Sequence, residues 1–264
     1  MSDGHDSVGH LSDGGGAVRR PTRVYRSALR TGQAAATRAR VAAAAGDLFA
    51  RQGYTRTSVR QIASEAGVAV ETVYAIGGKA AVFLRAFGTA LSGTTPGASL
   101  LDVEATADVW RATRLEEAVT GLVDVIVESN RRSASLWTAY VEAARCEAAL
   151  ADAYAEQMCA MREDGRRVLA ALVERDLCPP PRDAARTVDE VWVILHPGQY
   201  VLLVEHAGWS LADYRAWLID HLMRHLTAFR LVESDRAVPG RSGDGQAVER
   251  IVRRQSGKTP SAGG

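Results

Sequence analysis

The sequence lacks the features that mark a membrane-bound, secreted or disulfide-stabilised protein. No run approaches the roughly 18 uncharged apolar residues of a membrane span, and residues 1–16 carry three aspartates but no apolar core of a secretory signal. Three cysteines, Cys146, Cys159 and Cys178, are an odd number without Cys-x-x-Cys spacing, which disfavours a disulfide scaffold or a zinc ribbon. We therefore expect a protein of the reducing cytoplasm.

Signals of catalysis and of metal binding are also lacking. The chain has no Gly-x-Ser-x-Gly and no phosphate-binding loop, because the string Gly77-Gly78-Lys79 lacks the preceding strand and the upstream glycine of such a loop. His221 and His225 stand four residues apart on one expected helix face, a spacing that can hold a metal, but no His-Glu-x-x-His pattern accompanies them. We therefore expect that the protein is not an enzyme and that it holds no metal site and no cofactor.

Period-two alternation of apolar and polar residues is absent over more than a few residues, and apolar residues recur at helical spacing instead. Glycines, a Pro-Pro-Pro run and short polar stretches separate the periodic segments. The pattern predicts an all-α fold of about nine helices near 37–52, 58–66, 69–75, 79–91, 105–129, 133–148, 149–176, 183–207 and 211–231.

Charge is divided unevenly along the chain, although its net value is only +1. Residues 19–92 hold twelve Lys/Arg and three Asp/Glu, a net of +9, whereas residues 93–233 hold fourteen Lys/Arg and twenty-two Asp/Glu, a net of −8. A basic segment of this kind suits a polyanion such as DNA. Chance variation between solvated faces is the alternative explanation.

The basic segment contains the spacing of a helix-turn-helix, over about residues 58–77. Thr57 is the expected N-cap of its first helix, and Gly67 supplies the positive φ that the turn requires. The apolar positions expected to clamp the two helices are Ile62, Ala63, Val68 and Val73.

These residues belong to a longer string, Phe49-x-x-x-Gly53-Tyr54-x-x-Thr57-Ser58-Val59-x-x-Ile62-Ala63-x-x-Ala66-Gly67-Val68-x-x-x-Thr72-Val73-Tyr74. The string resembles the N-terminal domain of TetR-family transcriptional regulators, in which a lysine usually follows the tyrosine by six places. Here Lys79 follows Tyr74 by five. The link between the tyrosine and the lysine is therefore one residue shorter than in the family. We expect Ile76 to be the apolar residue that anchors this link to the protein, and the recognition helix to end early.

The resemblance implies that the domain binds double-stranded DNA. At a helix N-terminus, Thr57 and Ser58 are expected to donate to phosphates. Lys79 resembles the family's phosphate-contacting lysine, and Tyr74 is expected to direct its hydroxyl at a phosphate while its ring packs below.

Val70, Glu71 and Thr72 lead the expected recognition helix and are the candidates for contacts with base edges. Glu71 has the chemistry to accept from a cytosine amino group, and Val70 or the Thr72 methyl group to touch a thymine methyl. Capping or packing by Thr72, and simple solvation of Glu71, are the alternatives.

The chain is thus expected to comprise a disordered basic arm over 1–34, a DNA-binding domain over 35–95, a ligand-binding and dimerisation domain over 96–233 and a disordered tail over 234–264. Arginines mark the arm, which we expect to add phosphate or minor-groove contacts. They are Arg19, Arg20, Arg23, Arg26 and Arg30.

Aromatic residues and one histidine of the second domain are candidates for a pocket that takes a hydrophobic ligand, with core and dimer packing as the alternative. They are Trp110, Trp137, Tyr140, Trp192, His196 and Tyr200. Dimerisation is expected on the helices at 183–207 and 211–231, whose apolar surface exceeds one core-facing stripe, with Val201 and Leu222 as interface positions. Pro197 is expected to kink the first of them.

The sequence therefore predicts a homodimeric transcriptional regulator that binds a near-palindromic operator and responds to an unidentified, hydrophobic small molecule, as a repressor. The alternatives are an architectural DNA-binding protein without small-molecule input and, least favoured, an enzyme. A cavity of about 300–1,000 Å³ inside the second domain would distinguish the ligand-responsive regulator from the architectural protein.

Overall fold

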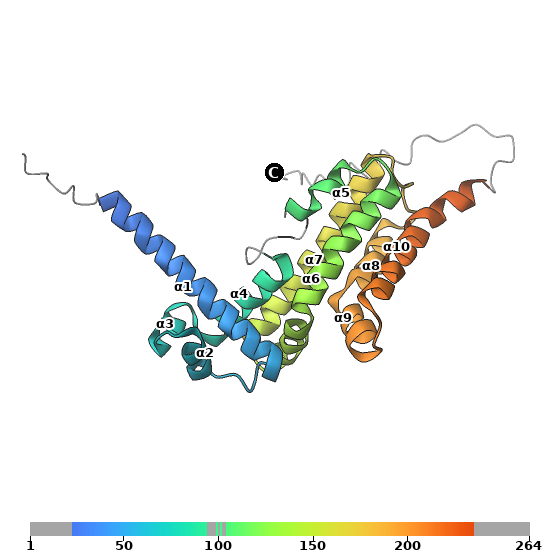
Figure 1. Cartoon of the computed structure of the whole chain (residues 1–264). Helices are drawn as coiled ribbons and strands as arrows, with labels where there is room; N and C mark the ends of the chain where they lie inside the picture. Colours follow the sequence, from blue (N-terminus) through green and yellow to red (C-terminus); the bar gives the residue numbers. More distant parts are fainter. Residues whose placement is uncertain (1–22, 94–98, 100, 102–103, 235–264) are drawn as a thin grey trace, which may run out of the picture.

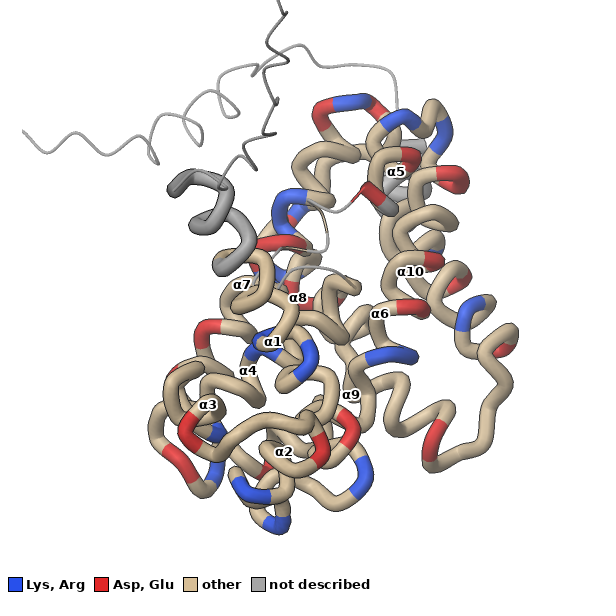
Figure 2. The backbone as a smooth tube through the Cα atoms, turned by 60° about the vertical axis from the view of Figure 1, so that its left-hand side comes forward, with Lys and Arg blue, Asp and Glu red and all other residues tan. Residues whose placement is uncertain are grey.

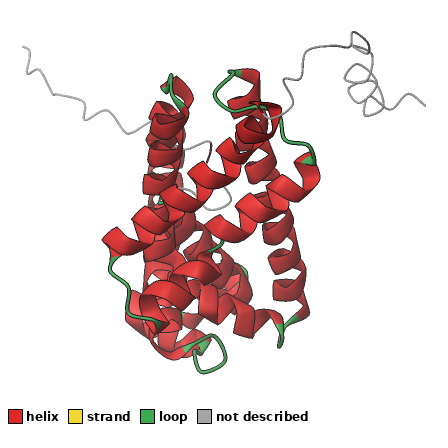
Figure 3. Ribbon diagram, turned by 90° about the vertical axis from the view of Figure 1, so that its right-hand side faces the viewer, coloured by secondary structure: helices red, strands yellow, loops and turns green. Residues whose placement is uncertain are grey.

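The computed structural model describes residues 23–93, 99, 101 and 104–234. Within these ranges the fold is all-helical and contains no strand (Figure 3). Ten α-helices are present in the described residues, where about nine were expected. The prediction of an all-α fold is confirmed.

Four helices form the N-terminal head: α1 (Arg23–Gln52), α2 (Val59–Ala66), α3 (Val70–Ala75) and α4 (Gly78–Ser92). As expected, α1 ends before Gly53, whose φ of 80° is readily adopted only by glycine. It begins much earlier than expected, because residues 23–34, assigned to a disordered arm, continue the helix. In Figure 1 this part of α1 extends away from the rest of the molecule.

The body contains six further helices: α5 (Ala107–Arg111), α6 (Leu115–Ala144), α7 (Ala148–Glu174), α8 (Ala184–Leu195), α9 (Pro197–Tyr200) and α10 (Leu211–Ser234). The predicted break near residues 129–133 is wrong, because α6 runs through it. Buried Ser129 and Ser133 stay within α6 by donating their hydroxyl protons to backbone carbonyls.

Pro197 interrupts the predicted helix 183–207, which therefore breaks where only a kink was expected. Since proline lacks an N–H, α8 ends at Leu195 and α9 begins with Pro197 as its first residue. A π-helical stretch, Val201–His206, then leads to the turn before α10. Ser210 caps α10, accepting a hydrogen bond from the Asp213 N–H at 3.1 Å.

Two hydrophobic cores hold the molecule together. The head core joins α1–α4 to Trp137 and Tyr140 of α6 and to Leu150 of α7. The body core joins α5, α7, α8, α9 and α10 to the other half of α6. Because α6 supplies side chains to both cores, the head does not close its core without the body.

Candidate nucleic-acid interface

The first helix of the helix-turn-helix, α2, is capped by Ser58. Its Oγ accepts from the Gln61 N–H at 3.2 Å, and the Ser58 N–H donates to Gln61 Oε1 at 2.8 Å. This reciprocal arrangement is a capping box. Ser58 is exposed, so the structure places this predicted residue where an anion can approach the helix N-terminus.

Thr57 does not cap α2, and this prediction is wrong. Its side chain is buried, with its hydroxyl donating to the Gly53 carbonyl at 2.8 Å and accepting from Gln52 Nε2 at 3.2 Å. Thr57 therefore fastens the connection between α1 and α2, and its hydroxyl does not face a phosphate.

The turn between α2 and α3 matches the expected geometry. Gly67 has φ 61° and ψ 43°, and the Val68 N–H closes the turn on the Ala63 carbonyl at 2.9 Å. Ile62 and Val73 are fully buried. The two helices are thus clamped by the predicted apolar positions.

The recognition helix α3 spans only Val70–Ala75. Glu71 is exposed, and Val70 and Thr72 are partly exposed, whereas Val73 faces the core. Tyr74 is 63% exposed, so its ring projects outward instead of packing below its hydroxyl as expected. These side chains form the exposed surface of the recognition helix.

Two glycines make the short link from α3 to α4. Gly77 has φ 115° and Gly78 has φ 78°, and a Cβ on Gly77 would lie 2.7 Å from the Ala81 Cβ. Ile76 packs partly buried against the head core, as expected of the apolar anchor. The link from Tyr74 to Lys79 is one residue shorter than the family pattern, and the two successive glycines with positive φ accommodate this shortening.

Lys79, in the first turn of α4, is turned toward the protein. Its Nζ lies 3.9 Å from the centroid of the Tyr54 ring, a cation–π contact. Burial lowers the pKa of Lys79, and the carboxylates of Glu147 and Glu142 oppose that shift. The predicted phosphate ligand thus already has partners within the protein.

Of the arginines assigned to the basic arm, Arg19 and Arg20 lie outside the described residues. Arg23, Arg26 and Arg30 belong to α1. Basic positions also lie around α2, interspersed with acidic ones, at the end of the molecule opposite α5 (Figure 2).

The body gathers four of the six predicted pocket residues. The His196 ring meets those of Trp137 and Trp192 edge to face, with centroids 4.9 Å and 5.5 Å away, and Trp137 also contacts Tyr140. The indole N–H of Trp192 is buried without a hydrogen-bond partner. Trp110 and Tyr200 pack in the body core instead, so the six do not form one pocket.

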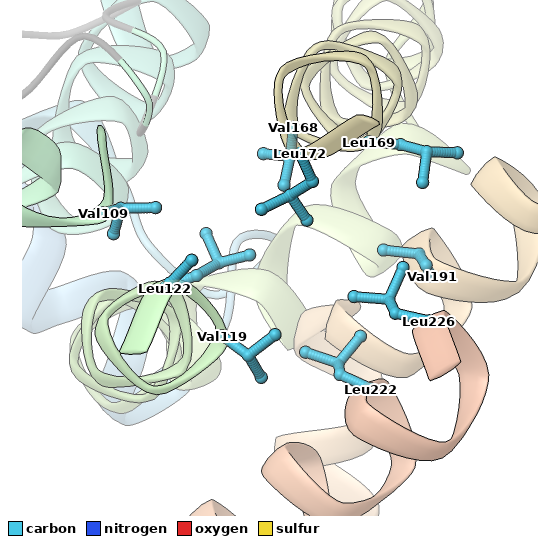
Figure 4. Close-up of a pocket in the computed structure, with 10 residues that line it drawn as sticks. Val109, Val119, Leu122, Val168, Leu169, Leu172, Val191, Leu222 and Leu226 are labelled. Atoms are coloured by element: carbon cyan, nitrogen blue, oxygen red, sulfur yellow. The ribbon is translucent and has the colours of Figure 1, made fainter. Parts of the chain in front are cut away.

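A separate, wholly apolar chamber lies between α5, α6, α7, α8 and α10 (Figure 4). Its lining is aliphatic, for example Val119, Leu172 and Leu222, and includes none of the six predicted residues. The enclosed volume is about 10 Å³, at the lower limit of what can admit a single water molecule. The body is therefore nearly closed in this conformation.

A larger, open groove of about 630 Å³ runs between α1, α4 and α6. Small residues such as Gly46 and Ala86 line it, together with Arg38, Arg85 and Asp47. It lies between head and body, so it is not the enclosed body cavity that the sequence led us to expect.

The described residues hold no cluster of three or more potential metal ligands. His225 contacts Glu190 at 2.5 Å, and His221 contacts the Trp217 carbonyl at 2.8 Å. None of the three cysteines, all within the described residues, forms a disulfide. No helix in the described ranges is long and apolar enough to cross a membrane.

A short helix, a glycine turn and an exposed second helix on a helical body define a helix-turn-helix DNA-binding protein. Residues 33–85 match the model of the bacterial regulatory proteins of the tetR family. The chain thus carries a TetR-family DNA-binding domain, and the expected resemblance is confirmed. No curated protein sequence matches the chain.

Solved structures with the same fold extend the comparison over the body. A transcriptional regulator from Saccharomonospora viridis in complex with choline is 18% identical, with a TM-score of 0.56, over 72% of this chain and 96% of that one. The fatty acid degradation regulator FadR from Bacillus halodurans is 18% identical, with a TM-score of 0.56, over 73% of this chain and 96% of that one. A transcriptional regulator from Rhodococcus sp. Rha1 is 23% identical, with a TM-score of 0.52, over 72% of this chain and 95% of that one.

Proposed function

We propose that this protein is a homodimeric transcriptional repressor of the cytoplasm, without enzymatic activity, that a hydrophobic small molecule releases from its operator. The observation that carries the proposal is the TetR-type helix-turn-helix with an exposed recognition surface at Val70, Glu71 and Thr72. Two copies of α3 would enter successive major grooves about 34–36 Å apart. Such an operator is nearly palindromic because the dimer is symmetric.

Selection of binding sequences from a random DNA pool tests this function. Inverted half-sites one helical turn apart are the expected result, and they would be absent if the protein bound DNA as an architectural element. Val70→Ala and Thr72→Ala are expected to change the selected bases, since contacts to base edges specify sequence. Ser58→Ala is expected to lower affinity without changing them.

Dimerisation is proposed on the segment from α8 to the start of α10. Four large apolar side chains are exposed there: Val193, Leu202, Trp209 and Leu211. Exposed apolar side chains grouped in this way are typical of an interface. Leu222, previously assigned to the interface, is 1% exposed and lines the chamber, so it belongs to the core of a single copy.

Sedimentation at micromolar concentration tests the interface. Leu202→Glu and Val193→Glu are expected to give monomers that keep their helicity and lose operator affinity, because a charge would be desolvated on each side of the two-fold axis. Ala160→Glu, at an exposed site on α7, is the matched control and leaves the dimer intact. A dimer that survives the first two substitutions would move the interface elsewhere.

The effector is proposed to be an apolar molecule, or to have an apolar part, that enters the chamber. The aliphatic lining supports this chemistry, as does the structural neighbour described with fatty acid degradation. Entry requires the lining side chains to move apart, since the chamber is water-sized. The closed chamber is also the observation that favours the architectural alternative.

Titration with a saturated fatty acid, with choline in parallel, distinguishes these functions. Release of the selected operator by the fatty acid is expected of the ligand-responsive repressor. Release by choline alone would contradict an apolar effector. Unchanged operator affinity with both probes would favour the architectural protein.

A further inference from the structure

The turn between α6 and α7 brings two carboxylates against the helix-turn-helix. Glu142 lies near the end of α6, and Glu147 is the N-cap residue of α7. Both are partly buried. Their partners are not on the body but on the head, between α1 and α2.

Glu147 accepts a hydrogen bond from the Tyr54 hydroxyl. Tyr54 is 3% exposed, and its ring stacks on Phe49 and meets Phe83 edge to face. The tyrosine is therefore held in place, and it fixes the Glu147 carboxylate beside the head. Burial and the neighbouring Glu147 both raise the Tyr54 pKa, so its hydroxyl remains a donor.

Glu142 makes a second contact with the same loop. It accepts from the Thr55 hydroxyl at 2.5 Å, and its Oε2 would lie 2.8 Å from a Cβ on Gly53. A side chain at position 53 would displace this carboxylate. The two carboxylates thus face one short loop, 53–55, from different sides of the α6–α7 turn.

The Lys79 ammonium lies over the same Tyr54 ring. Its charge is attracted by both carboxylates, and an attraction of this kind is weakly screened at partly buried sites. Lys79 directly follows the glycine link from the recognition helix. A phosphate that approaches this link must draw the ammonium away from these partners.

We propose that Glu142 and Glu147 restrain Lys79, competing with DNA phosphate for its ammonium and thereby lowering the affinity of the head for DNA. The proposal rests on the phosphate role assigned to Lys79. It makes the α6–α7 turn of the body a determinant of DNA affinity, although the turn lies outside the helix-turn-helix.

The test uses the full chain and a fluorescein-labelled duplex of random sequence, because phosphate contacts do not depend on sequence. Glu147→Gln and Glu142→Gln remove the charge but keep a carbonyl acceptor for Tyr54 or Thr55. Both are expected to bind more tightly than the wild type at low salt. One additional phosphate contact steepens the log–log salt slope by about 0.9, so between about 50 and about 200 mM salt the variants lose roughly 3.5-fold more affinity than the wild type.

Two controls separate this restraint from a general change of charge. Glu174→Gln removes an exposed carboxylate at the far end of α7, roughly 40 Å away at 1.5 Å per residue, and is expected to behave as the wild type. Lys79→Met removes the ammonium and keeps an apolar stem on the Tyr54 ring. In the Lys79→Met background, Glu147→Gln is expected to leave the salt slope unchanged, since coupled residues give non-additive effects.

An unchanged or lower affinity in folded Glu147→Gln and Glu142→Gln, verified by their thermal unfolding, would overturn the proposal. So would an equal gain in the Lys79→Met background, because the carboxylates would then act on DNA directly. Binding of the wild type to the duplex tests DNA binding itself, and the difference between wild type and variants tests the restraint.

Discussion

Replacing Gly77 with alanine tests the glycine link that places Lys79 behind the recognition helix. The backbone at Gly77 has φ 115° and ψ 10°, and an L-residue with positive φ costs about 1–2 kcal/mol. The new Cβ would also lie 2.7 Å from the Ala81 Cβ, which cannot rotate away. Overpacking of this kind costs about 1–3 kcal/mol, so the free energy of unfolding is expected to fall by roughly 2–5 kcal/mol.

Gly67→Ala is the matched control. Gly67 also has positive φ, but a Cβ there meets nothing within 4 Å, so only the backbone cost of about 1–2 kcal/mol applies. The loss of unfolded-state entropy, about 0.4–1 kcal/mol in favour of alanine, is common to both substitutions. The difference between the two variants therefore reports the contact with Ala81 together with the extra backbone cost of φ 115° at Gly77 over φ 61° at Gly67.

Thermal unfolding followed by circular dichroism measures this difference. For a chain of this size 1 kcal/mol corresponds to about 2–4 °C. Gly77→Ala is thus expected to have a Tm about 4–8 °C below that of Gly67→Ala if the contact costs about 2 kcal/mol. Equal Tm values would refute the reasoning, because they would show that the α3–α4 link relaxes without strain.

Three further substitutions probe the body. Leu222→Ala should lower the free energy of unfolding by about 2–5 kcal/mol in urea titrations and leave the sedimentation of the dimer unchanged. If this variant sedimented as a monomer, Leu222 would be part of the dimer interface after all. Tyr214→Phe removes the partner of the buried Asn130 amide, 3.0 Å away, and should cost about 1–3 kcal/mol; a neutral effect would mean that the amide finds another acceptor. Burial lowers the pKa of His196 below 6.5, so the unfolded chain binds this proton first as pH falls below about 6.5 and the wild type loses stability there. His196→Asn should remove that part of the pH dependence, and identical pH profiles for variant and wild type would contradict it.

Local sequence was sufficient for the helix-turn-helix because its determinants lie within a few residues of one another. Gly67 is required by a positive φ, and Ile62 and Val73 by the contact of two adjacent helices. The choice of cap was less well determined. Thr57 and Ser58 are adjacent hydroxyl residues, and which one caps α2 depends on where the turn after α1 places them.

Helical periodicity shows that a face is apolar, but not what covers it. Leu222 and Val193 lie in helices that both carry apolar residues, yet one is buried in the body core and the other is 48% exposed. The same ambiguity applies to the aromatic residues, because Trp110 joins the body core while Trp192 joins His196.

The sequence by itself determined the all-helical fold, the helix-turn-helix and the early end of the recognition helix, since each depends on spacing and backbone preference over a short stretch. Only the tertiary structure decided that Glu147 meets Tyr54, 93 residues earlier in the chain, and that the Lys79 ammonium lies over the Tyr54 ring. Such contacts depend on how the α6–α7 turn docks against the head. That docking is set by the shared core of α1, α4 and α6, which no local pattern encodes.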